Sequence, residues 1–397
     1  MSSLRRFLAF ILTFPVLVAF AFLTGCGGGS SSASNNTIVS SGNNVASISV
    51  NSGPTGNYAN GGFVSITVCV PGTSSCQTVD DVLVDTGSSG LRILSSFSPG
   101  LPQQEASGDP VFECFPFESG YTWGPVQTAD VEIAGEKASS VPVQLVGTNT
   151  AVPDGCLDFG LPSSNTLDSL GANGIFGVGL FAQDCGEYCV QVQTGNPNLY
   201  YQCASSPCQA IGESLAQQVP NPVTLFATDN NGVIIELPGV SGGEPSLSGS
   251  LVFGIGTQSN NALGAATVYT ADSSGSFTTT YSGTPYSGSF IDSGSNGYFF
   301  PSTTIAECSD SSDAPGFYCP STTENLSASN QGVNGSSGTV NFSVADASTL
   351  FDSNDYVFND LGGPASGYFD WGLPFFYGRN VFTGIQSDSY PNGYWAY

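Results

Sequence analysis

The sequence predicts an all-β protein with many turns, and two observations carry this prediction. Gly (51 residues) and Pro (24 residues) are abundant while charged residues make up only 9% of the chain, a composition that disfavours helices. Short apolar runs bounded by Gly, Asn, Ser or Pro recur throughout, which is typical of strands. These runs cover residues 63–70, 82–84, 131–133, 141–146, 233–237 and 250–253. We expect helix only at residues 211–218 and, as a second candidate, at residues 301–308.

Charge and composition exclude several classes of function. Five Lys and Arg against 31 Asp and Glu give a net charge of −26, so the chain lacks the basic surface that a nucleic acid requires. It contains no His, which excludes a Ser-His-Asp triad, a Cys-His pair and a His-ligated zinc. We therefore expect neither a metal nor a cofactor. The length of 397 residues suits two domains or lobes, each with its own core.

The N-terminus resembles a bacterial lipoprotein signal. Two arginines precede an apolar stretch that ends in Leu23-Thr24-Gly25-Cys26. This resemblance implies that residues 1–25 are removed, that Cys26 is lipidated, for instance with palmitate, and that residues 26–45 form a flexible Gly- and Ser-rich tether. The protein would then be exported and anchored by its lipid to the bacterial cell envelope, and Gly27 favours the outer membrane. The alternative is an ordinary signal peptide or a short membrane anchor.

Ten further cysteines, an even number in an exported chain, predict disulfides. Cys69 with Cys76 and Cys308 with Cys319 are close enough in sequence to pair. Four cysteines at positions 185, 189, 203 and 208 could staple one long loop. A metal site at Cys185 and Cys189 is the competing interpretation, and export together with the lack of His disfavours it.

An internal repeat divides the chain into two halves. Residues 82–90 return as residues 289–297: both segments end an apolar run in Asp, a hydroxyl residue, Gly and Ser, followed by a polar residue and Gly. A second apolar segment with Gly follows in each half, at residues 174–179 and 371–375. This duplicated order of elements predicts two related lobes.

The repeated tripeptide, Asp85-Thr86-Gly87 and Asp292-Ser293-Gly294, has a chemical logic. A strand fixes the carboxylate, Gly allows a sharp turn and a close approach, and the hydroxyl residue can bond to the opposite loop. When two such loops meet, two carboxylates share one proton, since both cannot easily ionise side by side. The pair can then activate a water molecule for attack on a carbonyl.

These motifs resemble those of the pepsin-like aspartic peptidases, and the resemblance covers most of the chain beyond the tether. It implies an all-β, bilobal fold of two β-barrel-like lobes, residues 46–237 and 238–397, with a cleft between them. Residues 118–135 are similar to the family's flap hairpin and its return strand, residues 248–256 to the strand that opens the second lobe, and residues 372–383 to the C-terminal strand. The implied site comprises the catalytic Asp85 and Asp292, the supporting Thr86, Gly87, Ser88, Ser293, Gly294 and Ser295, and the flap residues Phe117, Glu118, Ser119, Gly120 and Tyr121.

The resemblance fails at two positions. The family's flap tyrosine aligns with Phe117, and the tryptophan with which it usually pairs aligns with Arg92. Phe cannot make the hydroxyl hydrogen bond that closes such a flap. Arg92 could pair with Glu118, lie against the Phe117 ring, or simply neutralise a nearby acid, and Tyr121 and Trp123 are possible substitutes for the missing pair.

The favoured function is an aspartic endopeptidase that binds an extended peptide or protein in the cleft and works best at acidic pH. We expect a monomer. The alternative is a non-catalytic surface lipoprotein that binds peptide or polysaccharide on the same scaffold. A purely structural lipoprotein would leave the two Asp loops unexplained. An aromatic cluster could form a sugar platform, and we expect it to be core instead: Tyr368, Phe369, Trp371, Phe375, Phe376 and Tyr377.

Overall fold

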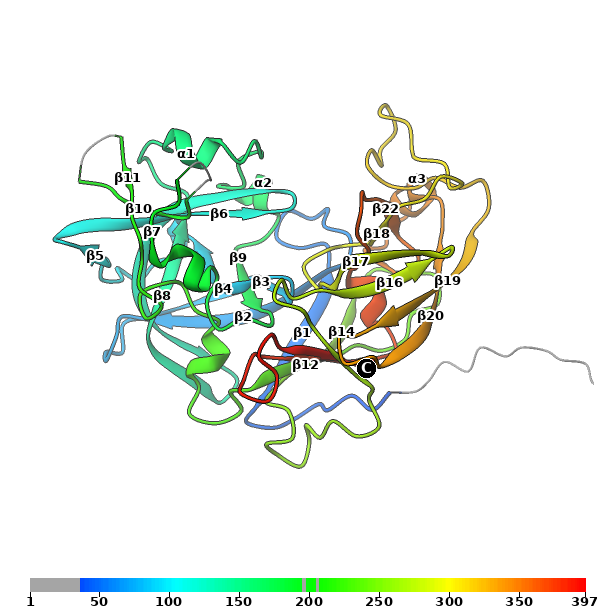
Figure 1. Cartoon of the computed structure of the whole chain (residues 1–397), viewed down its shortest axis with the longest axis horizontal. Coiled ribbons are helices and arrows are strands. Elements are labelled where there is room, and N and C mark those ends of the chain that lie inside the picture. Colours follow the sequence, from blue (N-terminus) through cyan, green and yellow to red (C-terminus); the bar gives the residue numbers. More distant parts are fainter. Residues whose placement is uncertain (1–35, 195–197, 205–206) are drawn as a thin grey trace, which may run out of the picture. The chain divides into compact units, whose positions relative to one another are not determined.

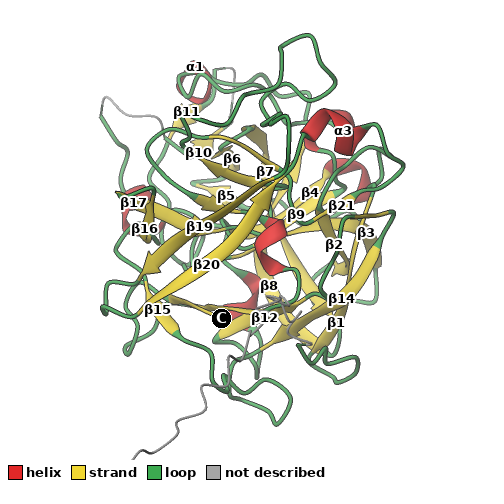
Figure 2. Cartoon of the chain, turned by 90° about the vertical axis from the view of Figure 1, so that its right-hand side faces the viewer, coloured by secondary structure: helices red, strands yellow, loops and turns green. Residues whose placement is uncertain are grey.

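Strands dominate the chain, as the sequence predicts, and 42% of the residues lie in them against 8% in helices (Figure 2). The computed structural model describes residues 36–194, 198–204 and 207–397. The predicted signal peptide, the lipidation site at Cys26 and most of the tether lie outside the described residues. All elements below belong to the unit Ser34–Tyr397.

The larger sheet has sixteen strands, and part of it closes into a barrel. Its order is β11-β10-β6-β7-β8-β4-β9-β3-β2-β1-β14-β12-β24-β25-β15, with β5 paired to β6. Because β7 also pairs with β2, the strands β2, β3, β9, β4, β8 and β7 form a closed ring. The strands are β1 (Val45–Asn51), β2 (Gly61–Cys69), β3 (Cys76–Asp85), β4 (Ser89–Leu94), β5 (Glu105–Ala106), β6 (Asp109–Phe117), β7 (Gly120–Ile133), β8 (Glu136–Val146), β9 (Gly174–Val178), β10 (Tyr200–Gln202), β11 (Gln209–Ala210), β12 (Gly232–Glu236), β14 (Leu247–Phe253), β15 (Val268–Thr270), β24 (Asn380–Gly384) and β25 (Tyr394–Ala396).

A second sheet has seven strands in the order β20-β19-β16-β17-β23-β18-β22. These strands are β16 (Phe277–Tyr281), β17 (Thr284–Ile291), β18 (Tyr298–Phe300), β19 (Glu324–Gln331), β20 (Ser337–Val344), β22 (Gly362–Pro364) and β23 (Asp370–Trp371). A small sheet pairs β13 (Gly243–Glu244) with β21 (Val357–Phe358). Figure 1 shows the barrel strands and the seven-stranded sheet as two groups, with β1, β12 and β14 along their base.

Helices among the described residues are short. They are α1 (Asp154–Leu157), α2 (Leu167–Leu170), α3 (Ala347–Phe351) and the 3-10 turns η1 (Ser95–Phe97), η2 (Gly186–Val190), η3 (Pro222–Leu225) and η4 (Leu373–Phe376). No helix of the described residues is long and apolar enough to cross a membrane.

Both helices predicted from the sequence are wrong. At residues 211–218, Gly212 packs against the backbone of Val190 and the Glu213 N–H donates to the carbonyl of Cys189, so the start of the segment lies along a neighbouring loop. A single turn follows, in which the N–H groups of Gln217 and Gln218 donate to the Ser214 carbonyl. At residues 301–308, the Cys308 N–H donates to the Phe317 carbonyl next to the disulfide between Cys308 and Cys319. In both places a backbone donor that a helix would use is bonded to a distant segment.

The strand predictions are confirmed, because each predicted run lies in β3, β7, β8 or β14, or in β2 or β12 and the residue after it. Most of their apolar side chains belong to one large core cluster, which also takes in Phe369, Trp371, Phe375, Phe376 and Tyr377. The aromatic cluster is therefore core at these five positions. Tyr368 differs, since it lines a cavity.

All ten described cysteines form disulfides, as predicted. Cys69 pairs with Cys76 and Cys308 with Cys319, and a pair that the sequence did not indicate joins β6 to α1 through Cys114 and Cys156. The quartet forms two separate short loops, which corrects the idea of one stapled long loop. Cys185 pairs with Cys189, which removes the thiolates that a metal ion would need, and Cys203 pairs with Cys208.

Candidate active site

The same three-strand arrangement holds each Asp loop. In the first half, β3 ends at Asp85 and runs parallel to β9, while β4 returns antiparallel on the other side of β9. In the second half, β17 ends one residue before Asp292 and runs parallel to β23, while β18 returns antiparallel beside β23. The internal repeat seen in the sequence is therefore a repeat of local structure.

The apolar segments with Gly that follow each loop pass directly under it. A Cβ atom on Gly177 would lie 2.7 Å from the backbone of Ser89, and a Cβ atom on Gly372 would lie 2.1 Å from the carbonyl oxygen of Gly297. Both distances are shorter than side chains tolerate. These glycines are needed because two backbones come together under the carboxylates.

Four hydrogen bonds join the two loops through Thr86 and Ser293. The Ser293 N–H donates to Thr86 Oγ1 (2.9 Å) and the Thr86 N–H donates to Ser293 Oγ (3.1 Å). The Thr86 hydroxyl donates to the Ile291 carbonyl (3.2 Å), and the Ser293 hydroxyl donates to the Val84 carbonyl (2.7 Å). Both side chains are buried, so these bonds fix one loop against the other, as the sequence predicts.

The two carboxylates accept a hydrogen bond from the same backbone group. The Gly87 N–H donates to Asp85 Oδ1 (2.8 Å) and to Asp292 Oδ1 (3.2 Å). The Gly294 N–H donates to Asp292 Oδ1 (2.7 Å). A Cβ atom on Gly87 would lie 2.7 Å from the Asp292 carboxyl carbon, and one on Gly294 would lie 2.9 Å from that of Asp85. Only glycine fits at either position.

A serine three residues after each Asp completes the hydrogen bonding of its carboxylate. The Ser88 hydroxyl donates to Asp85 Oδ2, and the Ser295 hydroxyl donates to Asp292 Oδ2 at 2.9 Å. Burial raises the pKa of Asp292 well above its usual value, and the charge and hydrogen bonding of Asp85 raise it further. Asp292 therefore holds a proton at a pH where an ordinary Asp is ionised.

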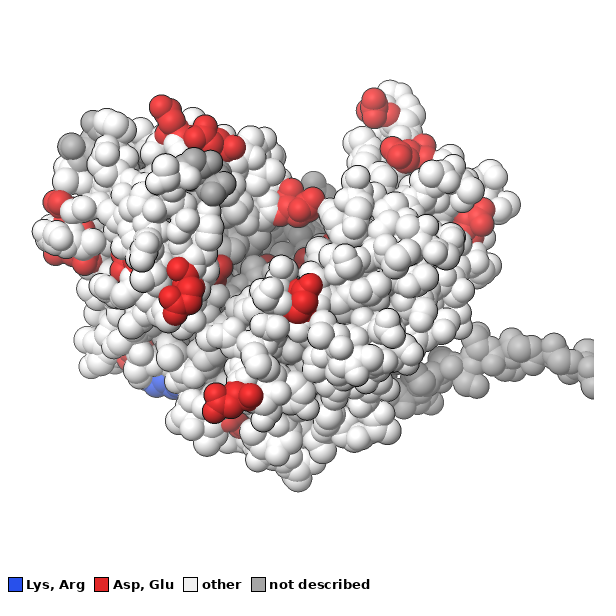
Figure 3. All heavy atoms as spheres, in the orientation of Figure 1, with Lys and Arg blue, Asp and Glu red and all other residues white. Residues whose placement is uncertain are grey.

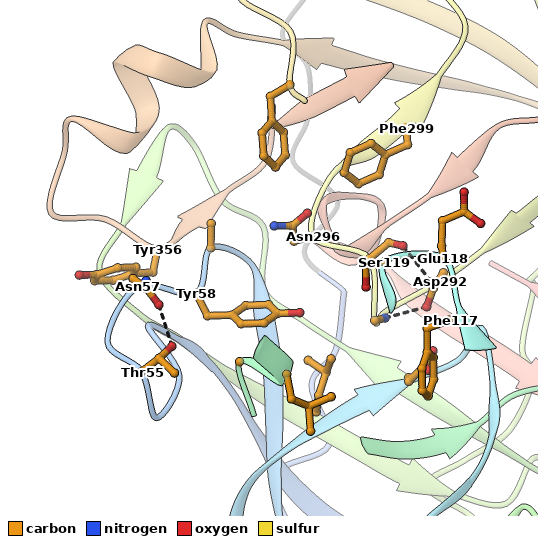
Figure 4. Close-up of a pocket in the computed structure, with 18 of the residues that line it drawn as sticks. Thr55, Asn57, Tyr58, Phe117, Glu118, Ser119, Asp292, Asn296, Phe299 and Tyr356 are labelled. Carbon is orange, nitrogen blue, oxygen red and sulfur yellow. Dashed lines mark hydrogen bonds between the residues drawn. The ribbon is translucent and has the colours of Figure 1, made fainter. Parts of the chain in front are cut away.

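Both carboxyl groups line a cavity of about 950 Å³. Its walls come from both halves of the chain: the loop of residues 55–59, the tip of the β6–β7 hairpin and residues 168–171 on one side, and residues 294–299 with Tyr356 on the other. Figure 4 shows Asp292 and the hairpin tip on one side of this space and Thr55, Asn57 and Tyr356 on the other. Tyr58 lies between them, with its hydroxyl group toward the Asp292 side. A second cavity of about 320 Å³ borders Gly87 and Ser88 and reaches Phe115 and Phe290.

The predicted flap residues divide into two groups. Phe117, Glu118 and Ser119 line the cavity, and the Tyr368 hydroxyl donates to Glu118 Oε1 (2.8 Å), which links the hairpin tip to the second half. Gly120 and Tyr121 pack against residues 162–164, and the Tyr121 ring is buried in a core cluster behind the hairpin. These two residues hold the hairpin and do not face the cavity.

Arg92 is fully buried in an ion-pair network. Its Nη2 lies 2.7 Å from Glu113 Oε1 and 3.0 Å from Asp184 Oδ2, and its guanidinium lies over the rings of Phe115 (3.7 Å) and Phe117 (5.7 Å). The expected contact with Phe117 is present, while the expected pair with Glu118 is not, because Glu113 takes its place. The plainer interpretation, that Arg92 neutralises nearby acids, holds.

Trp123 does not replace the missing flap pair. Its ring is buried and its Nε1 donates to the carbonyl of Thr150 at 3.0 Å, which places it behind the hairpin with Tyr121. Tyr58 instead presents a hydroxyl group to the cavity. Its ring meets the Phe63 ring edge-on, with 5.6 Å between the ring centroids.

The sequence analysis missed Tyr58 and Asp370. Burial raises the pKa of the Tyr58 hydroxyl, and the charges of Asp292 and Asp85 raise it further, so this hydroxyl stays protonated and faces the pair. Its loop is fixed by Asn60, which donates to the carbonyls of Asn296 (2.8 Å) and Phe358 (2.9 Å). No local sequence pattern marks Tyr58. Asp370 directly precedes the repeated apolar segment, so the repeat itself could have drawn attention to it.

The site can bind a polar molecule between two carboxyl groups, of which Asp292 has a raised pKa. Across residues 36–194, 198–204 and 207–397, no three Asp, Glu, Cys or His side chains gather as a set of metal ligands. The chemistry that the described residues themselves offer is proton transfer to and from a group held at Asp85 and Asp292.

Comparison with known proteins gives a family. No curated protein matches the chain. Residues 40–397, which include both Asp loops, the hairpin and the cavity, match the model of a family described as a protein of unknown function (DUF3443). Because this match extends over far more than half of the sequence, the chain belongs to the DUF3443 family.

Proposed function

We propose that the protein is an aspartic endopeptidase. One observation carries the proposal: a single N–H, that of Gly87, donates to both Asp85 and Asp292, on two loops held together by Thr86 and Ser293. Two carboxyl groups so close together share one proton. This is the arrangement that hydrolyses an amide with a water molecule and no covalent intermediate.

The steps follow from a pair in which Asp292, whose pKa is raised, carries the shared proton. Asp85, as carboxylate, takes a proton from the water molecule, and the oxygen of the water attacks the carbonyl carbon of the scissile bond. At the same time Asp292 gives its proton to the carbonyl oxygen. The tetrahedral species then collapses, the C–N bond breaks, and the proton on Asp85 passes to the leaving nitrogen. Asp292 regains its proton from the hydroxyl group that becomes the new carboxyl group.

The fold family is part of the proposal. The matching strand arrangements β3–β9–β4 and β17–β23–β18 support a bilobal, pepsin-like fold with lobes at residues 46–237 and 238–397. The cavity walls from both halves and the hairpin tip at the site support a cleft for an extended peptide. The second cavity beside Gly87 and Ser88 would let that peptide continue past the catalytic pair.

The test is proteolysis by the full chain, purified in detergent, of a denatured protein mixture from acidic to neutral pH. Cleavage by the wild type and its loss in both Asp85→Asn and Asp292→Asn would support the proposal. If the wild type cuts nothing, or if either variant cuts as well as the wild type, the proposal is wrong.

A second candidate is a non-catalytic protein that binds peptide or polysaccharide in the same cleft. Phe117 favours it, because this position of the hairpin lacks the hydroxyl group expected of a catalytic flap. This candidate predicts that the wild type binds an unfolded chain or a glycan without cutting it, so the proteolysis assay separates the two functions.

We also propose an exported, lipid-anchored protein of the bacterial cell envelope, with the outer membrane favoured. The sequence pattern ending at Cys26 supports it. Cys26→Ser is expected to move the protein from the membrane fraction to the soluble fraction. Unchanged membrane association would contradict the lipid anchor.

A further inference from the structure

Asp370 is a buried acid with an unused oxygen at the wall of the active-site cavity. The residue is only 4% exposed and lines the cavity. Its Oδ1 has no hydrogen-bond partner within the part of the chain that the structure describes. A buried carboxylate oxygen without a donor is costly. This oxygen is shielded from solvent, and a carboxyl group that turns toward the cavity would gain the missing donor from a bound ligand.

The internal repeat shows that the catalytic pair does not need this acid. In the first half, Ile175 on β9 is the Cα partner of Leu83 on β3. In the second half, Asp370 on β23 is the Cα partner of Phe290 on β17. Asp370 thus stands where the first loop has isoleucine. The carboxyl group was introduced on one side of the cleft only.

The cavity around Asp370 is strongly negative. Seven of its lining residues are Asp or Glu and none is Lys or Arg. Figure 3 shows acidic side chains at the rim of the hollow between the two groups of strands, with the blue basic atoms well away from it. The nearest charges acting on Asp370 are those of Asp292 and Glu118.

The three basic residues that the structure describes are engaged elsewhere. Arg92 is buried with Glu113 and Asp184, and Lys137 pairs with Asp130 and Glu132. Arg379 donates to the Phe375 carbonyl (2.6 Å). None of the three lines the cavity, so a cation for Asp370 has to come with a bound molecule.

We propose that Asp370 and Glu118 form a subsite for a cationic side chain, Lys or Arg, of the peptide in the cleft. The inference rests on the proposed peptidase function and names its substrate class. The ammonium or guanidinium group would donate to the Asp370 carboxylate. Its apolar stem would lie along Phe299, which is half-buried, lines the cavity and is the Cα partner of Asp370 between β18 and β23.

The protonation state of Asp370 links this subsite to pH. Burial raises its pKa well above the usual value, the charges of Asp292 on β17 and Glu118 on the hairpin raise it further, and the Ser295 hydroxyl acts in the opposite direction. A bound cation favours the ionised form. The preference for Lys or Arg should therefore increase as the pH rises.

The test is a binding assay, so that it does not depend on turnover. The scissile amide of each peptide is replaced by a non-cleavable group that bears a hydroxyl. Lys, norleucine or Glu is placed at one position at a time, before or after this group. Fluorescence polarisation with the full chain in detergent measures their affinities. At one position Lys should bind at least about tenfold tighter than norleucine, and Glu should bind more weakly than either.

Asp370→Asn should bring the Lys-to-norleucine ratio close to one, and thermal unfolding checks that this nearly isosteric variant folds. Asp168→Asn, which removes a different carboxylate from the cavity wall, is the matched control and should keep the ratio. Equal affinities for Lys and norleucine in the wild type, a ratio that survives Asp370→Asn, or no binding of any peptide would overturn the subsite.

The two proposals fail in distinguishable ways. If the Lys peptides bind with the expected preference but unmodified peptides of the same sequence are not cut, the peptidase proposal fails and the subsite stands. If peptides are cut without a preference for a cationic residue at any position, the peptidase proposal stands and the subsite fails.

Discussion

The two Asp loops are alike where they touch the carboxyl groups and different one strand away. Thr86 and Ser293 exchange equivalent hydrogen bonds, and a serine three residues after each Asp donates to that Asp. Each loop also crosses a glycine of a deeper strand. These groups form the environment of the pair, and both halves of the chain keep them.

The differences lie at positions that surround the pair without touching it. The residue seven positions after the Asp is Arg92 in the first half, buried in an ion-pair network, and Phe299 in the second half, on the cavity wall. The strand beneath each loop carries Ile175 in the first half, on β9, and Asp370 in the second half, on β23. The comparison teaches that the two halves keep the same groups around the pair and differ in the groups beyond it.

The largest expected effect tests the symmetric part. Asp85→Asn and Asp292→Asn should each lower kcat for a peptide substrate by about a hundredfold to ten-thousandfold, because each removes one member of a proton-sharing pair. The measurement is initial rate at the acidic optimum. Either variant keeping more than about a tenth of the wild-type rate would break the equivalence of the two loops.

The next largest effect separates Arg92 from its counterpart Phe299. Arg92→Met should lower the free energy of unfolding by about 3–5 kcal/mol, since it leaves Glu113 and Asp184 buried without their cation. Phe299→Met, a swap of similar volume on a half-buried side chain, should cost less than about 1.5 kcal/mol. Urea unfolding followed by tryptophan fluorescence measures both, and equal losses would contradict the assigned difference.

A smaller effect concerns the hydrogen bonds between the loops. Thr86→Val and Ser293→Ala should each lower the free energy of unfolding by about 1–3 kcal/mol, because each leaves a buried N–H of the other loop without its acceptor. The two variants break different hydrogen bonds between the same two loops. Residues in one network couple, so the loss in the double variant should differ from the sum of the single losses. Strict additivity would show that the two residues act independently.

The smallest effect is a pH slope. The pKa of Asp292 is higher in the folded chain than in the unfolded chain, so its contribution to stability is full at low pH and is lost as pH rises through the raised pKa. Between the pKa of an ordinary Asp and the raised pKa of Asp292, the free energy of unfolding should fall by at most about 1.4 kcal/mol per pH unit for this group. Urea midpoints against pH should show a shallower fall in Asp292→Asn. An unchanged slope would contradict the shared proton.

Local signals let the sequence predict several strands and the centre of the site. The Asp-Thr-Gly and Asp-Ser-Gly loops are contiguous, they occur twice, and each is followed by a segment whose glycine marks a close backbone approach. Apolar runs bounded by turn residues likewise marked β2, β3, β7, β8, β12 and β14. The disulfides of Cys69 with Cys76 and of Cys308 with Cys319 were predictable from their short spacing.

Contacts between distant segments explain what the sequence did not predict. The partners of Arg92 lie on β6 and in the loop after β9, and only the closed barrel brings them together. Tyr58 reaches the carboxyl groups because Asn60 ties its loop to the second half of the chain. The helix expected at residues 211–218 is reduced to a single turn, because the Glu213 N–H donates to the distant carbonyl of Cys189.

The central claim is that Asp85 and Asp292 act as one unit on a tetrahedral species in the cleft. The most direct measurement is isothermal titration calorimetry with two peptides of the same sequence. In one the scissile amide is replaced by a tetrahedral secondary alcohol, and in the other by a planar alkene. Binding at acidic pH should be at least about a hundredfold tighter for the alcohol, and this difference should disappear in both Asp85→Asn and Asp292→Asn. Equal affinities for the two peptides in the wild type would contradict the account.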